Sequence, residues 1–314
     1  MCHSTIIFVL DFKKKYKNDY SKRFNMKLNF TKMQGIGNDF IVINNIDKNL
    51  KFNKEIIQFL SNRKFGIGAD QVLLVEKSSN LQADFKYRIF NSDGSEVENC
   101  GNGARCFIKF IHQKKLSNKN PIYAEIRNGL IKIESLENNM VKVDMGKIAF
   151  DPHLLPFHYH KLLSEKQADE RLWTIDLLNN DKIEHIKISI AQISNPHAVT
   201  IVDNIQNIDV NFIGRMIESH ERFPNHVNVG FMEILNKHNI KLRVYERGVG
   251  ETLACGTGAC AAALSGIRRG LLLSPVTVHT HGGQLIIHWD GLKLEMEGPA
   301  ETVFEGKIEV NFNN

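Results

Sequence analysis

The chain has 314 residues, 42% of them hydrophobic and 24% charged, which is the composition of a globular protein with room for two domains. Its formal net charge is +5, but residues 1–25 carry six Lys and Arg against two Asp and Glu, which leaves +1 for the rest. A nearly neutral body gives little support for a nucleic-acid groove, and the apolar run 6–10 is far shorter than the ~20 residues that span a bilayer. We therefore expect neither a nucleic-acid nor a membrane partner.

Residues 1–25 predict an N-terminal extension that is disordered. Their apolar run precedes the Lys13-Lys14-Lys15 cluster, which is the reverse of the order in a signal peptide. The chain has five cysteines, an odd number, without CxxC spacing. With no export signal, this pattern indicates free thiols in a reducing compartment, so we expect a cytoplasmic protein.

Apolar alternation predicts most of the secondary structure in chain order. We expect a short amphipathic helix at 53–60 and a hairpin at Asn128-Gly129 that joins strands 122–127 and 130–135. The segment 151–169 predicts a linker or an irregular insertion. The other predicted strands are 27–33, 40–43, 71–76, 83–90, 187–193, 198–202, 227–234, 241–245, 276–280, 284–289 and 293–297.

Two familiar kinds of site are not supported. The Gly35-Ile36-Gly37 turn opens no helix, so it does not predict a dinucleotide site. The three histidines of segment 151–169 have no carboxylate or cysteine at ligand spacing, so we expect no metal site. The histidines concerned are His153, His158 and His160.

One motif occurs twice. The run Cys100-Gly101-Asn102-Gly103-Ala104 returns as Cys255-Gly256-Thr257-Gly258-Ala259, 155 residues later. The same offset aligns Phe90 with Tyr245 and Glu96 with Glu251. Each copy predicts a strand end, a polar turn, a cysteine and then a helix start, which indicates two duplicated halves.

The chemistry of a helix start explains why a cysteine there is informative. Free backbone N–H groups at a helix start favour an anion such as a carboxylate, and the same positive end lowers the pKa of a thiol. If the halves face each other across a substrate, one sulfur takes a proton from an α-carbon while the other delivers one from behind. Two matched acid–base groups are what a racemase or epimerase needs. Cys106 and Cys260 lie deeper in their helices and predict core packing.

The fold predicted by this duplication belongs to the α+β class. The helical segments 102–112 and 259–267 are apolar around most of their circumference, which is typical of buried helices. Several short strands surround each helix. We therefore expect two pseudo-symmetric domains, each a β-barrel-like curved sheet around a central buried helix.

With these motifs in view, the sequence resembles the diaminopimelate epimerases, which interconvert LL- and meso-diaminopimelate without a cofactor in lysine and peptidoglycan synthesis. The resemblance runs from about Met26 to the C-terminus and does not cover residues 1–25. The matching motifs are residues 35–40, 90–96, 100–106, 195–197, 246–248 and 251–260.

The resemblance implies a role for each matching residue. Cys100 and Cys255 would be the acid–base pair, and His197 and Glu246 would tune the two thiols. The substrate would be bound by Asn38, Gln71, Asn91, Gly101, Asn102, Asn195, Asn228, Glu246, Arg247, Gly256 and Thr257.

The resemblance also implies a domain organisation. The last strand would return to the first domain, so that one domain comprises 26–146 with 301–314 and the other 147–300. Two positions depart from the family pattern. Thr257 stands where many relatives have Ser, and Phe304 stands where some carry a Tyr at the contact of a homodimer.

Two alternatives remain open. A proline racemase or hydroxyproline epimerase has less need for a second amino-acid grip than Asn195, Asn228 and Glu246-Arg247 supply. A thiol–disulfide redox protein would use Cys100 and Cys255 without isomerase activity.

Overall fold

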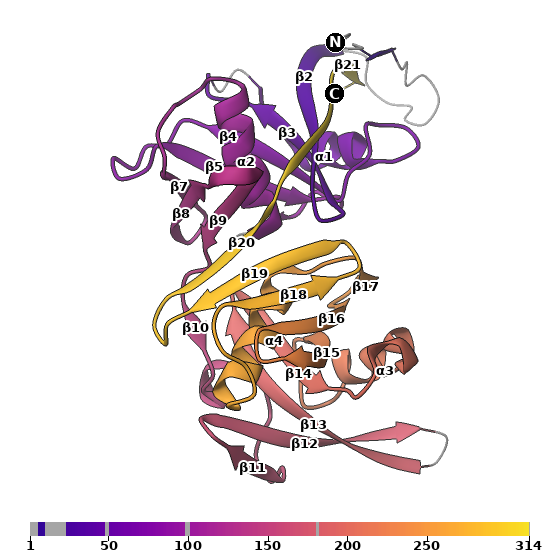
Figure 1. The fold of residues 1–314 in the computed structure, drawn as a ribbon. Coiled ribbons are helices and arrows are strands. Elements are labelled where there is room, and N and C mark those ends of the chain that lie inside the picture. The colour runs from indigo at the N-terminus through magenta and orange to yellow at the C-terminus, as the bar shows by residue number, and fades with distance from the viewer. Residues whose placement is uncertain (1–5, 10–22, 48–49, 98–100, 180–181, 314) are drawn as a thin grey trace. The chain divides into compact units, whose positions relative to one another are not determined.

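The computed structural model describes residues 6–9, 23–47, 50–97, 101–179 and 182–313. The chain forms two compact units (Figure 1). Unit 1 comprises Met1–Gly35, Asp39–Ile133 and Ala300–Asn314, and unit 2 comprises Ile36–Asn38 and Glu134–Pro299. The domain boundaries expected from the sequence stay a prediction.

Unit 1 is a mixed sheet with two helices. Its strand pairs are β2–β21, β2–β3, β3–β4, β4–β5, β5–β6, β5–β7 and β7–β8, with β1 beside β21. The elements are β1 (Ile6–Val9), β2 (Arg23–Gly35), β3 (Asn38–Asn44), α1 (Lys54–Ser61), β4 (Gln71–Glu76), β5 (Phe85–Asn91), β6 (Glu96–Val97), α2 (Gly101–Gln113), β7 (Ile122–Ile126), β8 (Gly129–Ser135) and β21 (Glu301–Asn313).

Unit 2 is a larger sheet with two α-helices. Its elements are β9 (Met140–Asp144), β10 (Ile148–Ala149), β11 (Ser164–Gln167), β12 (Glu170–Asn179), β13 (Lys182–Ile193), β14 (Asn195–Ile201), α3 (Val210–Glu218), β15 (Asn228–Asn236), β16 (Asn239–Glu246), β17 (Gly250–Thr252), α4 (Gly256–Arg268), β18 (Val276–Thr280), β19 (Gly283–Trp289) and β20 (Leu294–Pro299). Three short 3-10 helices complete it, at Glu137–Asn139, Pro152–Leu154 and Ile205–Asn207.

The two units repeat one topology. In unit 1, β3 is parallel to β4, β4 antiparallel to β5, β5 parallel to β7, and β7 antiparallel to β8. In unit 2, β14, β15, β16, β18 and β19 follow the same order of directions. Parallel neighbours need a crossover connection, and helices supply it: α1 and α2 in unit 1, α3 and α4 in unit 2. Shifting α2 by 155 residues gives the bounds of α4.

The central helices are buried, as their sequences predict. The first eight residues of α2 are all buried, as are ten of the 13 residues of α4. Close packing explains the glycine at position 103, because a Cβ there would lie 2.4 Å from Tyr87 Oη and 3.3 Å from Phe40 Cε1. The α+β fold with one buried helix within the sheet of each unit is thereby confirmed.

Three expectations from the sequence change. The hairpin after β7 turns at Arg127-Asn128, because Ile126 pairs with Gly129 and Gly129 starts β8 with φ +148°. Segment 151–169 contains β11 and contributes Phe157, 4% exposed, to the core of unit 2. Helix α3 was not predicted.

The predicted extension 1–25 is partly strand. Residues 6–9 form β1, which pairs in parallel with β21, and residues 23–25 belong to β2. Residues 1–5 and 10–22 lie outside the described part of the chain.

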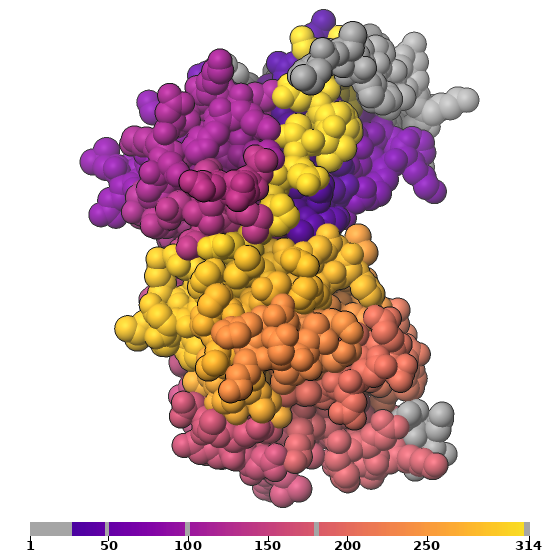
Figure 2. Space-filling model, viewed as in Figure 1, coloured from indigo at the N-terminus to yellow at the C-terminus, as the bar shows by residue number. Residues whose placement is uncertain are grey.

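The C-terminal strand belongs to unit 1, as the resemblance implied. Figure 2 shows β21, in yellow, at the surface between segments coloured indigo and magenta. It pairs with β2 along most of its length. Ile308 and Val310 are buried while Lys307 is exposed, which is the alternation of a strand with one face on the core.

Candidate active site

Cys255 stands at the start of the buried helix α4. It is the N-cap residue, with extended φ and ψ of −126° and 115°, and its thiol is buried at 5% exposure. Its Sγ lies 3.5 Å from Thr257 Oγ1. The amides of Gly256 and Thr257 lie in the first turn, where backbone N–H groups have no acceptor within the helix. The geometry therefore sets a thiol beside donors that suit a carboxylate.

The protonation state of Cys255 differs from the expectation. Burial raises the pKa of the Cys255 thiol well above its ordinary value, and the charge of Glu246 raises it further. The Thr257 hydroxyl and the Gly258 backbone N–H act in the opposite direction. The prediction that the helix start lowers the thiol pKa is thus wrong for Cys255, because desolvation outweighs the helix dipole. Cys255 is a thiol at neutral pH.

Glu246 and Arg247 end β16, beside Asn228 at the start of β15. Thr252 Oγ1 donates a hydrogen bond of 2.6 Å to Glu246 Oε1. Buried Asn228 accepts from the backbone N–H of Arg247 at 3.0 Å and donates to Pro196 O at 2.9 Å. Asn228 therefore ties the Arg247 backbone to β14.

The predicted Asn195-Pro196-His197 segment begins β14. His197 Nε2 lies 2.9 Å from Asn195 Oδ1, and since that oxygen can only accept, Nε2 donates and Nδ1 remains an acceptor. Burial lowers the pKa of His197 to about 3, with a further decrease from the charge of Arg247. The imidazole is therefore neutral across the physiological range.

Unit 1 carries the counterpart of this arrangement. Gln71 and Asn91 face each other across β4 and β5, and Gln71 Nε2 donates to Asn91 Oδ1 at 2.9 Å. The buried Gln71 Oε1 has no hydrogen-bond partner among the described residues. Gly101 and Asn102 are buried in the first turn of α2, whereas Cys100 lies outside the described residues.

An ion cluster adjoins two predicted binding residues in unit 1 and was missed by the sequence reasoning. Asp39 follows Asn38, and Asp70 precedes Gln71. Arg63 bridges both carboxylates, at 2.7 Å to Asp39 and 2.8 Å to Asp70. Burial would raise the pKa of Asp39, but hydrogen bonds from Arg63 and the buried Lys32 outweigh it and hold that pKa well below its usual range. The cluster thus fixes the adjoining ends of the parallel strands β3 and β4.

A second missed feature is an ion pair that each unit repeats. Arg88 binds Glu96 through two hydrogen bonds of 2.8 and 2.9 Å, and Arg243 binds Glu251 through two of 2.6 and 2.9 Å. Both arginines and both glutamates are 155 residues apart, so the offset found at the cysteines was the signal that would have revealed them. Each pair joins the strand and the returning turn that precede the cysteine.

The described predicted residues form two separate groups. In unit 1, a hydrogen bond joins Gln71 and Asn91. In unit 2, hydrogen bonds and electrostatic interactions connect a larger set. Its members are Asn195, His197, Asn228, Glu246, Arg247, Cys255 and Thr257. Asn38 is grouped with unit 2, without a printed contact to these residues.

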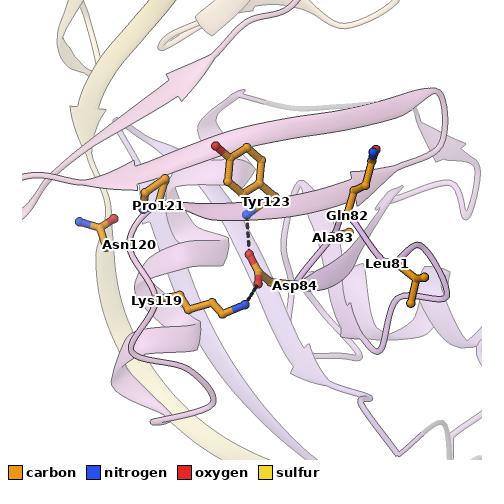
Figure 3. A pocket seen from close by; sticks show the side chains of 8 residues that line it. All are labelled: Leu81, Gln82, Ala83, Asp84, Lys119, Asn120, Pro121 and Tyr123. Carbon is orange, nitrogen blue, oxygen red and sulfur yellow. Dashed lines mark hydrogen bonds and ion pairs between the residues drawn. The ribbon is translucent and has the colours of Figure 1, made fainter.

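The pocket in Figure 3 contains none of the predicted residues. It has a volume of about 460 Å³ and lies in unit 1. Its carboxylate is already satisfied, because Asp84 accepts from Lys119 Nζ at 2.5 Å and from the backbone N–H of Tyr123 at 2.9 Å. This surface therefore shows no sign of the chemistry expected from the cysteine motifs.

Among the described residues, no helix is long and apolar enough to cross a membrane. Within the same part of the chain, no three His, Cys, Asp or Glu side chains are grouped as they would be around a metal ion.

Comparison with solved structures shows the fold. A hydroxyproline epimerase from Agrobacterium vitis has a TM-score of 0.65 at 14% identity, covering 92% of this chain and 93% of its own. A phenazine biosynthesis protein from Bacillus anthracis has a TM-score of 0.60 at 16% identity, covering 91% and 99%. At these identities the likeness concerns the fold alone.

Sequence comparison is more specific. The family model for diaminopimelate epimerase matches residues 30–150 and 189–303. The diaminopimelate epimerase of Burkholderia ambifaria is 52% identical over 291 residues, which are 91% of this chain and 99% of that protein. The one of Cupriavidus necator is 49% identical over 287 residues, 91% and 98% of the two chains. These matches confirm the resemblance seen at the cysteine motifs, and the chain therefore belongs to the diaminopimelate epimerase family of isomerases.

Proposed function

We propose that this protein interconverts LL- and meso-diaminopimelate in lysine biosynthesis, with Cys100 and Cys255 as the acid–base pair. The observation that carries the proposal is the near-complete match to proteins named diaminopimelate epimerase, at about half identity. The duplicated helix starts, offset by 155 residues, support the two-cysteine mechanism because inversion needs one proton-transferring group on each face of the α-carbon.

The raised pKa of Cys255 suggests its part in one direction of the reaction. As a buried thiol, Cys255 is the acid, and Cys100 in that direction is the thiolate base. The thiolate takes the α-proton, the electron pair of the broken C–H bond is left on the α-carbon, and the Cys255 proton forms the new C–H bond from the opposite face. The cysteines exchange roles for the reverse direction.

The helix starts would stabilise the charge that develops during this step. We assign the reacting carboxylate to the first-turn amides of Gly101, Asn102, Gly256 and Thr257, because pre-oriented N–H groups favour negative charge without reorganisation. Neutral His197 and the carboxylate of Glu246 would tune the thiols.

The remaining polar side chains would bind the distal amino-acid end of the substrate. We assign this role to Asn38, Gln71, Asn91, Asn195, Asn228, Glu246 and Arg247. The hydrogen bonds that hold Asn228 against Arg247 and Gln71 against Asn91 support the assignment, since they fix donors and acceptors before a ligand arrives. An amino acid with two zwitterionic ends suits this set better than proline does.

The test is to incubate the reduced protein with LL-diaminopimelate in deuterated water and follow product and α-deuterium by NMR. We expect meso product with deuterium at the inverted carbon. Cys100→Ser and Cys255→Ser should each lower the rate at least about a hundredfold, whereas Cys260→Ala, within the core of α4, should remain active. Absence of inversion and exchange with reduced thiols would refute the substrate assignment, and proline and hydroxyproline would be tried next.

Three finer points belong to the same proposal. We place the enzyme in the cytoplasm, as a homodimer, working without added metal or cofactor. Sedimentation would measure the oligomeric state. Activity that survives dialysis against a chelator would support the last point, and activity restored only by a metal ion would overturn it.

A further inference from the structure

The two units differ at a pair of positions near the cysteine motif. Where unit 1 has Asn91 and Val97, unit 2 has Glu246 and Thr252, each 155 residues later. In unit 2 the two side chains are bonded, Thr252 Oγ1 donating to Glu246 Oε1 at 2.6 Å. Thus the unit with a carboxylate also has a hydroxyl aimed at it, and the unit with an amide has an apolar side chain instead.

The amide of unit 1 is held by other groups. Asn91 accepts from Gln71 Nε2 at 2.9 Å and donates to Ser95 Oγ at 3.3 Å. The residue that aligns with Gln71 is Asn228, and both of its printed side-chain bonds go to the backbone, at Pro196 and Arg247. The Thr252 hydroxyl therefore takes over in unit 2 the function that a neighbouring side-chain amide has in unit 1.

The charges around Glu246 make its position consequential. Its carboxylate acts directly on Cys255. Arg243 is bound to Glu251, with His281 Nδ1 3.9 Å from Glu251. His197 is neutral, and the guanidinium of the exposed Arg247 donates to a backbone carbonyl, that of Asn225. A hydroxyl donor fixes both the rotamer and the charge of such a carboxylate.

We propose that Thr252 is a positioning residue of the epimerase, whose hydroxyl holds the Glu246 carboxylate charged and oriented toward Cys255. The inference rests on the proposed function of Cys255. The simpler explanation is that Thr252 is a β-branched residue chosen for a strand. Thr252→Val separates the two, because it keeps the branched shape and strand preference and removes only the hydroxyl.

The first readout does not require activity. Alkylation of Cys255 by iodoacetamide, followed across pH by mass spectrometry, reports the fraction of thiolate. In Thr252→Val the carboxylate is released, so we expect the alkylation midpoint to move to lower pH, in the direction of Glu246→Gln. Thr252→Ser should restore the wild-type midpoint. The matched control is Val97→Thr at the corresponding position of unit 1, which should leave the Cys255 midpoint unchanged.

The second readout is the pH profile of diaminopimelate epimerisation. Thr252→Val should lower kcat about tenfold, the effect expected for one hydrogen bond to a charged group, and displace the profile, while Thr252→Ser restores both. An unchanged alkylation midpoint in a folded Thr252→Val protein would overturn the proposal. If that variant does not fold, a displaced midpoint in Thr252→Ser would overturn it instead. A wild-type protein without epimerase activity would refute the proposed function, and the alkylation result would still decide the coupling.

Discussion

The repeated ion pair offers a test in which each unit serves as the control for the other. We consider Glu251→Gln in unit 2 and Glu96→Gln in unit 1, which keep the shape of the side chain and remove its charge. The Glu251 and Arg243 side chains are 17% and 16% exposed, against 33% and 28% for Glu96 and Arg88. The unit 2 pair is therefore less screened by solvent, and its loss should cost more.

The partners left behind also differ. After Glu251→Gln, Arg243 keeps only neutral acceptors among its printed partners, the carbonyls of Ile205 and Ile208 at 3.0 Å each. After Glu96→Gln, Arg88 still has a carboxylate 3.6 Å away, that of Glu76. We expect Glu251→Gln to lower the free energy of unfolding by about 2 kcal/mol and Glu96→Gln by about 1 kcal/mol.

Urea unfolding can separate the two effects. Both tryptophans, Trp173 and Trp289, lie in unit 2, so their fluorescence follows that unit, whereas circular dichroism follows both. Glu251→Gln should move the fluorescence transition to lower urea, and Glu96→Gln should move it less. A double-mutant cycle with Arg243→Gln would measure the coupling in unit 2. A larger loss for Glu96→Gln than for Glu251→Gln would refute the argument from burial and remaining charge.

Three further perturbations follow from particular contacts. Gly103→Ala sets a Cβ 2.4 Å from the hydroxyl of buried Tyr87 and should lower the free energy of unfolding by about 2 kcal/mol in thermal melts, and an unchanged melting temperature would contradict this packing. The pKa of Asp39 is lowered by folding, so its stabilisation is present above about pH 4 and is lost as the pH falls. Asp39→Asn should therefore cost about 2 kcal/mol at pH 7 and less at pH 3 in urea unfolding, and an equal loss at both would contradict the lowered pKa. Because the pKa of Cys255 is raised, its alkylation should be slow at neutral pH, and Glu246→Gln should accelerate it; rapid alkylation of the wild type at pH 7 would show the thiol to be more acidic than the structure indicates.

Local pattern was enough to predict most elements of both sheets and both buried helices. The bounds of β4 agree with the predicted strand 71–76, and α2 extends the predicted helix 102–112 by one residue at each end. The missed helix α3 has only three apolar residues buried or facing the core in a short segment, so periodicity alone is weak there. It corresponds to α1 with an offset of about 157 residues, and the duplication was therefore the stronger signal.

The candidate site shows the same division. The sequence determined that two cysteines begin two matched helices, because that information is local: a strand end, a Gly-rich turn and a helix start. Only the tertiary structure decided that Cys255 is a thiol, since burial and the charge of Glu246 come from surrounding elements. The ion pair of Arg243 with Glu251 and the hydroxyl of Thr252 on Glu246 likewise depend on the register of β16 against β17, which hydrogen bonding across the hairpin sets and which no single stretch of sequence displays.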